Sequence, residues 1–350
     1  MRSKFDTLKY IGCLVLIVLA ILIADPRSLW DTIAGVDLYL ISFVIILYVL
    51  NLVAKSYRWK VLMSDNGSCI KPPFRTVFAN FSFSQAVNNV TPGRVLGEAT
   101  RIYGASSRLG VKAGVGTALV VTEKIMDLVM ATSITIFGMA ILAPVLLGNI
   151  RNELGGIIII AVILNLILIA ILAKPKYLVI IGNHIHKLFT RIFPRKKDVS
   201  VNSSPLKFLN TFADSMAASD KAKRRTLLGA SVLTTLIWSN EILRIFLIIV
   251  ALGAPSNIAA ALVVTGVSAL SAVFLVAGSN HILISSAVLS AIGISSGVAT
   301  SVGIIAALTS IWLSVPIGLL AYFIDDRINK VSFNKEASKR AYSTTGKGDD

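Results

Sequence analysis

Charged residues, and acidic ones above all, are scarce in this sequence. Only 15% of its 350 residues are Asp, Glu, Lys or Arg, whereas soluble domains carry about 25% charged residues. Hydrophobic residues make up 55%, the mean hydropathy is +0.78, and 34 basic against 18 acidic residues give a formal net charge of +16. A nucleic-acid-binding domain carries such charge on a soluble surface. Here the cations lie between apolar runs, which excludes nucleic acid as the partner and predicts membrane lipids, with anionic headgroups, instead.

Cysteine is nearly absent, and the familiar catalytic motifs are missing. Cys13 and Cys69 fall in an apolar helix and a basic loop, so they predict no disulfide framework. The sequence contains no G-x-x-x-x-G-K-[ST], H-E-x-x-H or G-x-S-x-G pattern. His184 and His186 are two residues apart in a basic segment, a spacing that aims them poorly at one metal on a helix. We therefore expect no ATPase or hydrolase, no cofactor and no metal site.

Long apolar runs predict six membrane-spanning helices. They cover residues 10–24, 38–54, 128–147, 156–173, 226–252 and 299–324, and the third is the end of a long helix that begins at 113. The sequence around Ala24 lacks the small-x-small pattern of a cleaved signal peptide, so 10–24 is interpreted as a span. Basic residues crowd segments 55–75 and 174–225 and the tail after 325, which the positive-inside rule places in the cytoplasm. Both termini are then expected on the cytoplasmic side of the cell membrane.

Two further apolar segments are too short to cross a bilayer. Residues 76–90 would extend about 22 Å as a helix, less than the roughly 30 Å hydrocarbon core. The break Thr91-Pro92-Gly93 follows, and the chain then returns towards Tyr103, which predicts a re-entrant hairpin from the cytoplasm. In the second half, 257–277 and 282–294 flank the polar break Gly278-Ser279-Asn280-His281 and predict a second hairpin, from outside.

The predicted fold is therefore an all-α, polytopic helical membrane protein with six full spans and two re-entrant hairpins. Short, Gly- or Pro-broken helices at matching places in the two halves are typical of an inverted repeat. Two full crossings at 258–294 would keep the number of spans even and both termini on the same side, so eight spans fit equally well. We expect one transmembrane domain over 1–325 with halves at about 38–173 and 226–324, the basic segment 174–225 between them, and a basic cytoplasmic tail over 326–350.

Polar residues concentrate between positions 88 and 127, in otherwise apolar sequence. The Pro92-Gly93 break leaves free backbone N–H groups at the head of the next helix, where Arg94 adds a full positive charge and anions are attracted. Glu98 lies four residues after Arg94 and three before Arg101, so the three share one helical face. Preceded by Asn88 and Asn89, they predict either a buried anion-binding site or an interfacial amphipathic helix whose charges pair with one another.

Two more pairs of charged residues follow helical spacing. Glu123 and Asp127 lie four apart on one face and could be ion ligands, proton carriers, partners of the upstream arginines or residues at the inner interface. Glu241 and Arg244 lie near the middle of a predicted span, where charge is costly and is usually functional. A structural ion pair between these two is the other interpretation. His281 stands at the second polar break and could titrate near neutrality.

Three strings of residues resemble a large family of flippase-like membrane proteins, which are similar to the transmembrane region of lysylphosphatidylglycerol synthase, the multiple peptide resistance factor. The matching strings are Asn88-Asn89-x-x-Pro92-Gly93-Arg94-x-x-Gly97-Glu98-x-x-Arg101, Tyr57-Arg58-Trp59-x-x-Leu62 and Glu123-Lys124-x-x-Asp127. The resemblance covers roughly residues 10–325. It implies a central cavity and a link to movement of charged or glycosylated lipids across the bilayer.

This sequence departs from the family's pattern in its second half. No acid follows Ala277-Gly278-Ser279-Asn280-His281, and a later arginine is missing near Ser310. The soluble aminoacyl-transfer domain is not expected in the short tail, so the resemblance does not imply lysine transfer to lipid.

The first functional hypothesis is a lipid translocator or lipid-binding transporter for an anionic, phosphate-bearing or glycosylated headgroup. Arg94 and Arg101 would bind phosphate and Glu98 would orient them, while the charges at 123, 127, 241 and 244 would line or gate the cavity. The second hypothesis is a membrane partner that presents a polyprenyl-type lipid to a separate glycosyltransferase or lipid-modifying enzyme. The third is an enzyme with Glu98 or Asp127 as base. The sequence leaves the lipid, the direction of movement, the driving force and the oligomeric state open.

Overall fold

The computed structural model describes most of the chain, namely residues 26–64, 72–91, 95–111, 113–144, 162–163, 166–167, 222–272, 274 and 278–345. Every regular element in these segments is a helix, which confirms the all-α prediction. Predicted span 10–24, almost all of span 156–173 and of the basic segment 174–225, and the residues Pro92, Gly93 and Arg94 lie outside the described residues.

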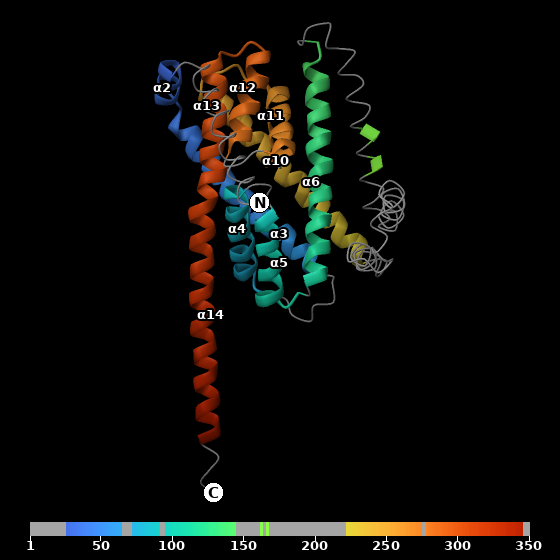
Figure 1. Ribbon diagram of the computed structural model, residues 1–350, viewed down its shortest axis with the longest axis vertical. Coiled ribbons are helices and arrows are strands. Elements are labelled where there is room, and N and C mark those ends of the chain that lie inside the picture. Colours follow the sequence, from blue (N-terminus) through green and yellow to red (C-terminus); the bar gives the residue numbers. More distant parts are fainter. Residues whose placement is uncertain are drawn as a thin grey trace, which may run out of the picture.

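The described helices follow one another in a bundle with one long helix projecting from it (Figure 1). The first half contains α2 (Pro26–Ala34), α3 (Leu38–Ser64), α4 (Phe74–Val90), α5 (Val95–Leu109) and α6 (Ala113–Leu142). The second half contains α10 (Ala222–Ala251), α11 (Ile258–Ser271), α12 (Ser279–Ala291), α13 (Ser296–Ala307), the π-helix η3 (Leu308–Trp312) and α14 (Leu313–Thr345).

Four helices in the described residues are long and apolar enough to cross a membrane. They are Leu38–Ser64, Ala113–Leu142, Arg225–Ala251 and the continuous run Ser296–Asn329, and they coincide with four of the predicted spans. Large apolar side chains on them face outwards, for example Phe137, Leu236 and Leu320. Such surfaces are stable against lipid tails but not against water. The chain is therefore a multi-pass helical membrane protein.

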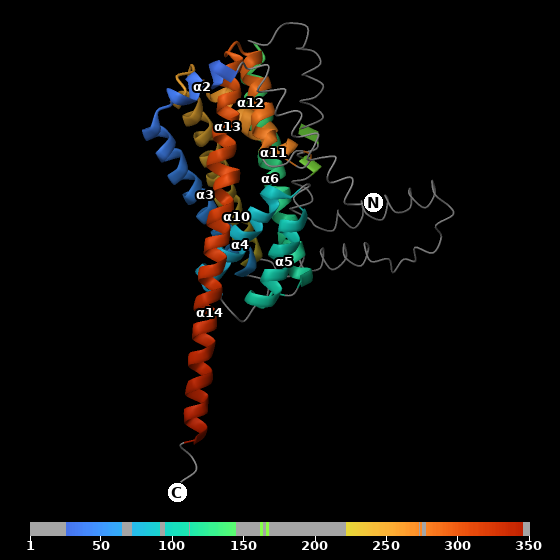
Figure 2. The same ribbon diagram turned by 60° about the vertical axis from the view of Figure 1, so that its left-hand side comes forward.

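Two pairs of shorter helices lie towards opposite ends of α6 (Figures 1 and 2). At one end α5 contacts α6 and packs on α4, and at the other α11 contacts α6 and packs on α12. α4 has 17 residues and α12 has 13, lengths of about 26 and about 20 Å at the helical rise. Within the first pair, a Cβ atom on Gly97 or Gly104 would overlap α4. α12 begins after Gly278, whose φ of 92° suits only glycine without strain.

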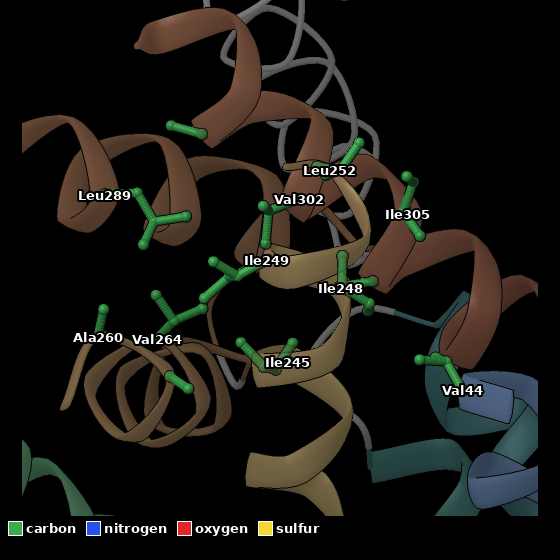
Figure 3. Packing of buried hydrophobic residues seen from close by; sticks show 13 residues of the cluster. Val44, Ile245, Ile248, Ile249, Leu252, Ala260, Val264, Leu289, Val302 and Ile305 are labelled. Atoms are coloured by element: carbon green, nitrogen blue, oxygen red, sulfur yellow. The ribbon is translucent and has the colours of Figure 1, made fainter. Parts of the chain in front are cut away.

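Several hydrophobic clusters hold the described helices together, and two of them are large. The first centres on Ile248 and Ile249 of α10, against which Leu289 of α12, Val302 of α13 and Val44 of α3 pack (Figure 3). The second lies mostly in the first half and also contains Ala230 of α10. It includes Trp59, Leu62, Val77, Phe81, Leu109 and Leu119.

The two halves are packed against each other along three helix pairs. α14 packs along α4, α11 along α6 and α10 along α3. Charged side chains on α3, α6 and α10 are therefore enclosed between helices, and the pairs they form across these helices join residues at least 65 positions apart in the sequence.

Candidate functional site

A cavity of about 590 Å³ lies between the halves and is lined by residues from α3, α4, α5, α6, α10, α11, α12 and η3. Part of its wall is apolar, with Leu128, Ala131, Ile237, Leu270 and Ile311. Asn51, Asn89, Thr265, Asn280, His281 and Ser310 are among its polar lining residues. Six charged residues also line it: Lys55, Arg58, Glu98, Lys124, Asp127 and Glu241. A cavity with both apolar and charged walls suits an amphiphile.

Arg58 of α3 is the centre of the first group of charges. Its Nη1 lies 2.7 Å from Asp127 Oδ1 and its Nη2 lies 2.9 Å from Glu123 Oε1, and both carboxylates belong to α6. Nη1 also donates to Thr234 Oγ1 of α10 at 2.9 Å. Trp238 Nε1 of α10 donates to Asp127 at 3.2 Å. The completely buried Arg58 side chain thus joins α3, α6 and α10.

Glu123 extends this group to α5. Its second oxygen lies 2.9 Å from Arg101 Nη1, so one buried carboxylate bridges two guanidinium groups. Arg101 also pairs with Glu98, and its guanidinium lies over the rings of Trp59 and Phe81, 4.5 and 5.1 Å from their centroids. Both terminal nitrogens of Arg101 are therefore paired with carboxylates of the protein.

Lys124 of α6 completes the first group. Its Nζ lies 2.6 Å from Glu98 Oε1, to which Asn88 Nδ2 also donates at 3.0 Å. We call this set the balanced group, because three cations are matched by three carboxylates: Arg58, Arg101 and Lys124 with Glu98, Glu123 and Asp127. Such a balance is expected in a low-dielectric interior, where an unpaired buried charge is destabilising.

A second set of charges, the Lys55 group, consists of Lys55 of α3 with Glu241 and Arg244 of α10. Lys55 Nζ lies 2.8 Å from Glu241 Oε1, and Arg244 Nη1 lies 2.7 Å from Glu241 Oε2. Arg244 Nη2 also donates to the carbonyl oxygen of Thr309 at 3.3 Å, and its guanidinium lies 5.0 Å from the ring centroid of Tyr48. Within the described residues no other carboxylate pairs with this group. Two cations share one carboxylate, which leaves one positive charge in excess.

An asparagine fixes the relative position of the helices that carry the Lys55 group. Asn51 Nδ2, one turn before Lys55 on α3, donates to the carbonyl oxygen of Ile237 at 2.9 Å and to Asn240 Oδ1 at 3.0 Å. Both acceptors belong to α10, so Lys55 and Glu241 are held opposite each other. In the described residues, no set of three His, Cys, Asp or Glu side chains could hold a metal ion.

The residues predicted from sequence occupy three kinds of position. Four of them line the cavity: Asn89, Glu98, Asp127 and Glu241. Four others lie behind the wall and pair with residues that line it: Asn88, Arg101, Glu123 and Arg244. The remaining three, Pro92, Gly93 and Arg94, lie outside the described residues.

Lys55, Arg58 and Lys124 belong to the site although the sequence did not predict them there. Basic residues from 55 onwards predict a cytoplasmic loop that contains Lys55 and Arg58, whereas α3 continues to Ser64. Both cations can lie inside the helix bundle because Glu241 of α10 pairs with Lys55 and Asp127 of α6 pairs with Arg58. The motif containing Arg58 was the only sequence signal for its importance, and Lys124 belongs to the Glu123-Lys124-x-x-Asp127 string.

Comparison with known proteins also indicates a membrane protein. The sequence profile of the lysylphosphatidylglycerol synthase TM region matches residues 10–318. A UPF0104 membrane protein of Pyrococcus horikoshii is 26% identical over 295 residues, which are 81% of this chain and 86% of that protein. No solved structure is significantly similar to the chain. Because the profile covers most of the chain, including both groups of charges, the protein belongs to the family of the lysylphosphatidylglycerol synthase transmembrane region.

Proposed function

We propose that this protein is a lipid translocator, or a lipid-binding transporter, for lipids with anionic, phosphate-bearing or glycosylated headgroups. The observation that carries the proposal is the cavity between the halves, where charged and apolar walls meet among membrane-crossing helices. Charges inside a membrane are costly and are usually retained along substrate pathways. A cation of the charged wall would bind the headgroup, and Leu128, Leu270 and Ile311 would contact the lipid chains next to it.

The family supports a lipid as the substrate. Its description refers to lysylphosphatidylglycerol synthase, whose named product is a lipid. The matching region is the transmembrane part of that protein, so we propose transport or binding for this chain and no catalytic reaction.

We further propose that the chain has six full spans and two re-entrant hairpins, with both termini on the cytoplasmic side of the cell membrane. The helices α4 and α5 would form one hairpin, and α11 and α12 the other. Their positions towards opposite ends of α6 support an inverted repeat (Figures 1 and 2). In inverted-repeat transporters the substrate binds where the repeats meet, and rocking of one against the other exposes it to each side.

A reconstitution experiment tests the proposal. The purified chain is placed in vesicles that contain a fluorescent lipid, and the fraction of lipid accessible to a membrane-impermeant quencher is followed over time. We expect the protein to accelerate the exchange of anionic or glycosylated lipids between the two leaflets, relative to protein-free vesicles. Unchanged exchange for all of these lipids would contradict translocation. A requirement for the chain in a reaction of a co-purified glycosyltransferase would support lipid presentation instead.

A further inference from the structure

We propose that Lys55 is the headgroup ligand of the cavity and that it binds a lipid with a single, monoanionic phosphodiester by exchanging Glu241 for the phosphate. This inference rests on the proposed function and names the class of lipid and the residue that binds it. It differs from the expectation drawn from the sequence, in which Arg94 and Arg101 bind the phosphate.

The distribution of charge places the anion site at the Lys55 group. The balanced group is neutral, so an anion added there would leave a net negative charge in a low-dielectric environment. The Lys55 group carries one excess positive charge, because Lys55 and Arg244 share Glu241. One monoanionic phosphodiester neutralises it, whereas a dianion would overcompensate.

The geometry allows the exchange. Lys55 and Glu241 both line the cavity, and their side chains are 24% and 25% exposed. The side chain of Arg244 is only 3% exposed and lies behind Glu241. When the flexible lysine turns from Glu241 to a phosphate, the carboxylate keeps its partner Arg244 at 2.7 Å. After the exchange Lys55 pairs with the phosphate and Glu241 with Arg244, so no charge of the group is left without a partner.

The other cations of the site are less suited to this role. Arg58 and Arg101 are buried and each pairs with two carboxylates. Lys124 has the same local arrangement as Lys55, since it pairs with Glu98, which also pairs with an arginine three residues away. Lys124 nevertheless belongs to the neutral group, and its carboxylate partners already match its charge. It therefore provides a matched control on the same cavity.

The test measures binding of didecyl phosphate, an amphiphilic phosphodiester without an amine, to the purified full-length chain in mild detergent by calorimetry. We expect Lys55→Gln to weaken binding about tenfold, the loss typical of one charge-assisted hydrogen bond. Lys55→Arg retains most of the affinity, and Lys124→Gln changes it less than about threefold, because it removes no ligand contact. Equal losses in Lys55→Gln and Lys124→Gln would overturn the assignment, since general positive charge would then be responsible.

Glu241→Gln provides a test with the opposite sign. Because Glu241 competes with the phosphate for Lys55, its neutralisation should tighten didecyl phosphate binding about tenfold. The same variant should show a larger ligand-induced rise in melting temperature than the wild type, a readout that remains informative if the free variant is less stable. Weaker binding and a smaller rise in melting temperature would refute the exchange.

Competing ligands separate the lipid from other sources of phosphate. Phosphatidylcholine, a zwitterion, should displace didecyl phosphate poorly. Inorganic phosphate should also displace it poorly, because it does not contact the apolar wall. Displacement by inorganic phosphate at equal concentration would show that the site binds free phosphate and would overturn the lipid assignment.

Failure of this inference is distinguishable from failure of the proposed function. Lys55-dependent binding without lipid exchange in vesicles would contradict translocation but support the site. If Lys55→Gln exchanged lipid at the wild-type rate and bound didecyl phosphate with wild-type affinity, translocation would be supported and the assignment of Lys55 as the headgroup ligand would be overturned.

Discussion

At the scale of single residues, Arg58 determines how the charges of the first half are arranged. It has no exposed surface and holds Glu123 and Asp127 of α6 at 2.9 and 2.7 Å. A buried ion pair contributes little compared with a well-packed apolar pair, but loss of one partner is strongly destabilising. The local charge balance is therefore more important than the number of ion pairs.

Arg58→Gln should destabilise the protein by about 3–5 kcal/mol, because it leaves the balanced group with an unpaired negative charge. Asp127→Asn added to this variant restores neutrality and should recover part of the loss. Thermal unfolding in detergent measures both effects, and Arg327→Gln on the exposed face of α14 serves as the control. A double variant no more stable than Arg58→Gln would argue against charge balance as the cause.

Arg244 should act as a positioning residue for Lys55. Arg244→Gln should fold, because Glu241 keeps Lys55 at 2.8 Å. Lys55 is then held by the only carboxylate partner in its group, so binding of didecyl phosphate should weaken about tenfold. Arg244→Lys should restore binding, since it again gives Glu241 a second cation. Wild-type affinity in Arg244→Gln would show that Lys55 needs no such support.

At the scale of elements, small residues set the distance between α4 and α5. A Cβ atom on Gly97 would overlap Asn88 Oδ1 and the carbonyl oxygen of Ser84, and one on Gly104 would overlap Asn80 Oδ1. Close helix approach through small residues is the usual form of packing in membranes. It brings Asn88 to Glu98 and Asn80 Nδ2 to the carbonyl oxygen of Arg101, at 3.0 and 3.1 Å.

Gly97→Ala should therefore separate the two helices and lower the melting temperature, with a loss of about 1–3 kcal/mol typical of overpacking. Gly116→Ala on α6 is the matched control, because its Cβ atom would meet Ile102 at an ordinary 3.6 Å. We expect it to be neutral. Equal melting temperatures for the two variants would show that α4 and α5 adjust without cost.

At the scale of the whole molecule, α14 joins the two halves at the end where α4 and α5 lie. The fully buried Asp325 of α14 lies 2.8 Å from Arg75 Nε of α4 and 3.7 Å from Arg108 Nη1 of α5. Thr76 Oγ1 donates to the same carboxylate at 3.0 Å. The guanidinium of Arg108 also lies 4.1 Å from the ring centroid of Tyr322. Arg108 therefore holds α5 against α14.

Asp325→Asn should lower the melting temperature more than Asp326→Asn, because Asp325 is enclosed while the Asp326 side chain is 35% exposed. Hydrogen bonds to a charged group contribute about 1.5–3 kcal/mol, whereas exposed ion pairs contribute about 0–1 kcal/mol. Thermal unfolding of the two single variants provides the comparison. Similar decreases in melting temperature for the two variants would mean that burial does not determine how much each carboxylate contributes to stability.

The topology has its own test in a chain whose two native cysteines, Cys13 and Cys69, are replaced. A cysteine at Ser256, an exposed position that avoids the capping side chain of Asn257, should react with an impermeant thiol reagent from outside the cell. A cysteine at Ser338, in the tail, should react only after permeabilisation. Labelling of Ser338 in intact cells would contradict the proposed orientation.

The sequence alone determined the class of the protein and the positions of its main helices. Long apolar runs require helices in a bilayer because backbone groups there must be hydrogen-bonded within the chain. The four long helices and the break after Val90 therefore followed from local patterns. The second break was predicted at 278–281, but Ser279, Asn280 and His281 already belong to α12, because helix α12 begins directly after Gly278. The pairing of Glu98 with Arg101 and of Glu241 with Arg244 followed from their three-residue spacing.

Only the tertiary structure decided which charges meet across helices. Lys55 and Glu241 are 186 positions apart, and Arg58 and Asp127 are 69 apart, so no local spacing connects them. A lysine at position 55 has the same sequence environment whether α3 ends before it, in a basic loop, or continues past it. The carboxylate that α10 places 2.8 Å away makes the second arrangement favourable, because it compensates the charge that the helix carries into the protein.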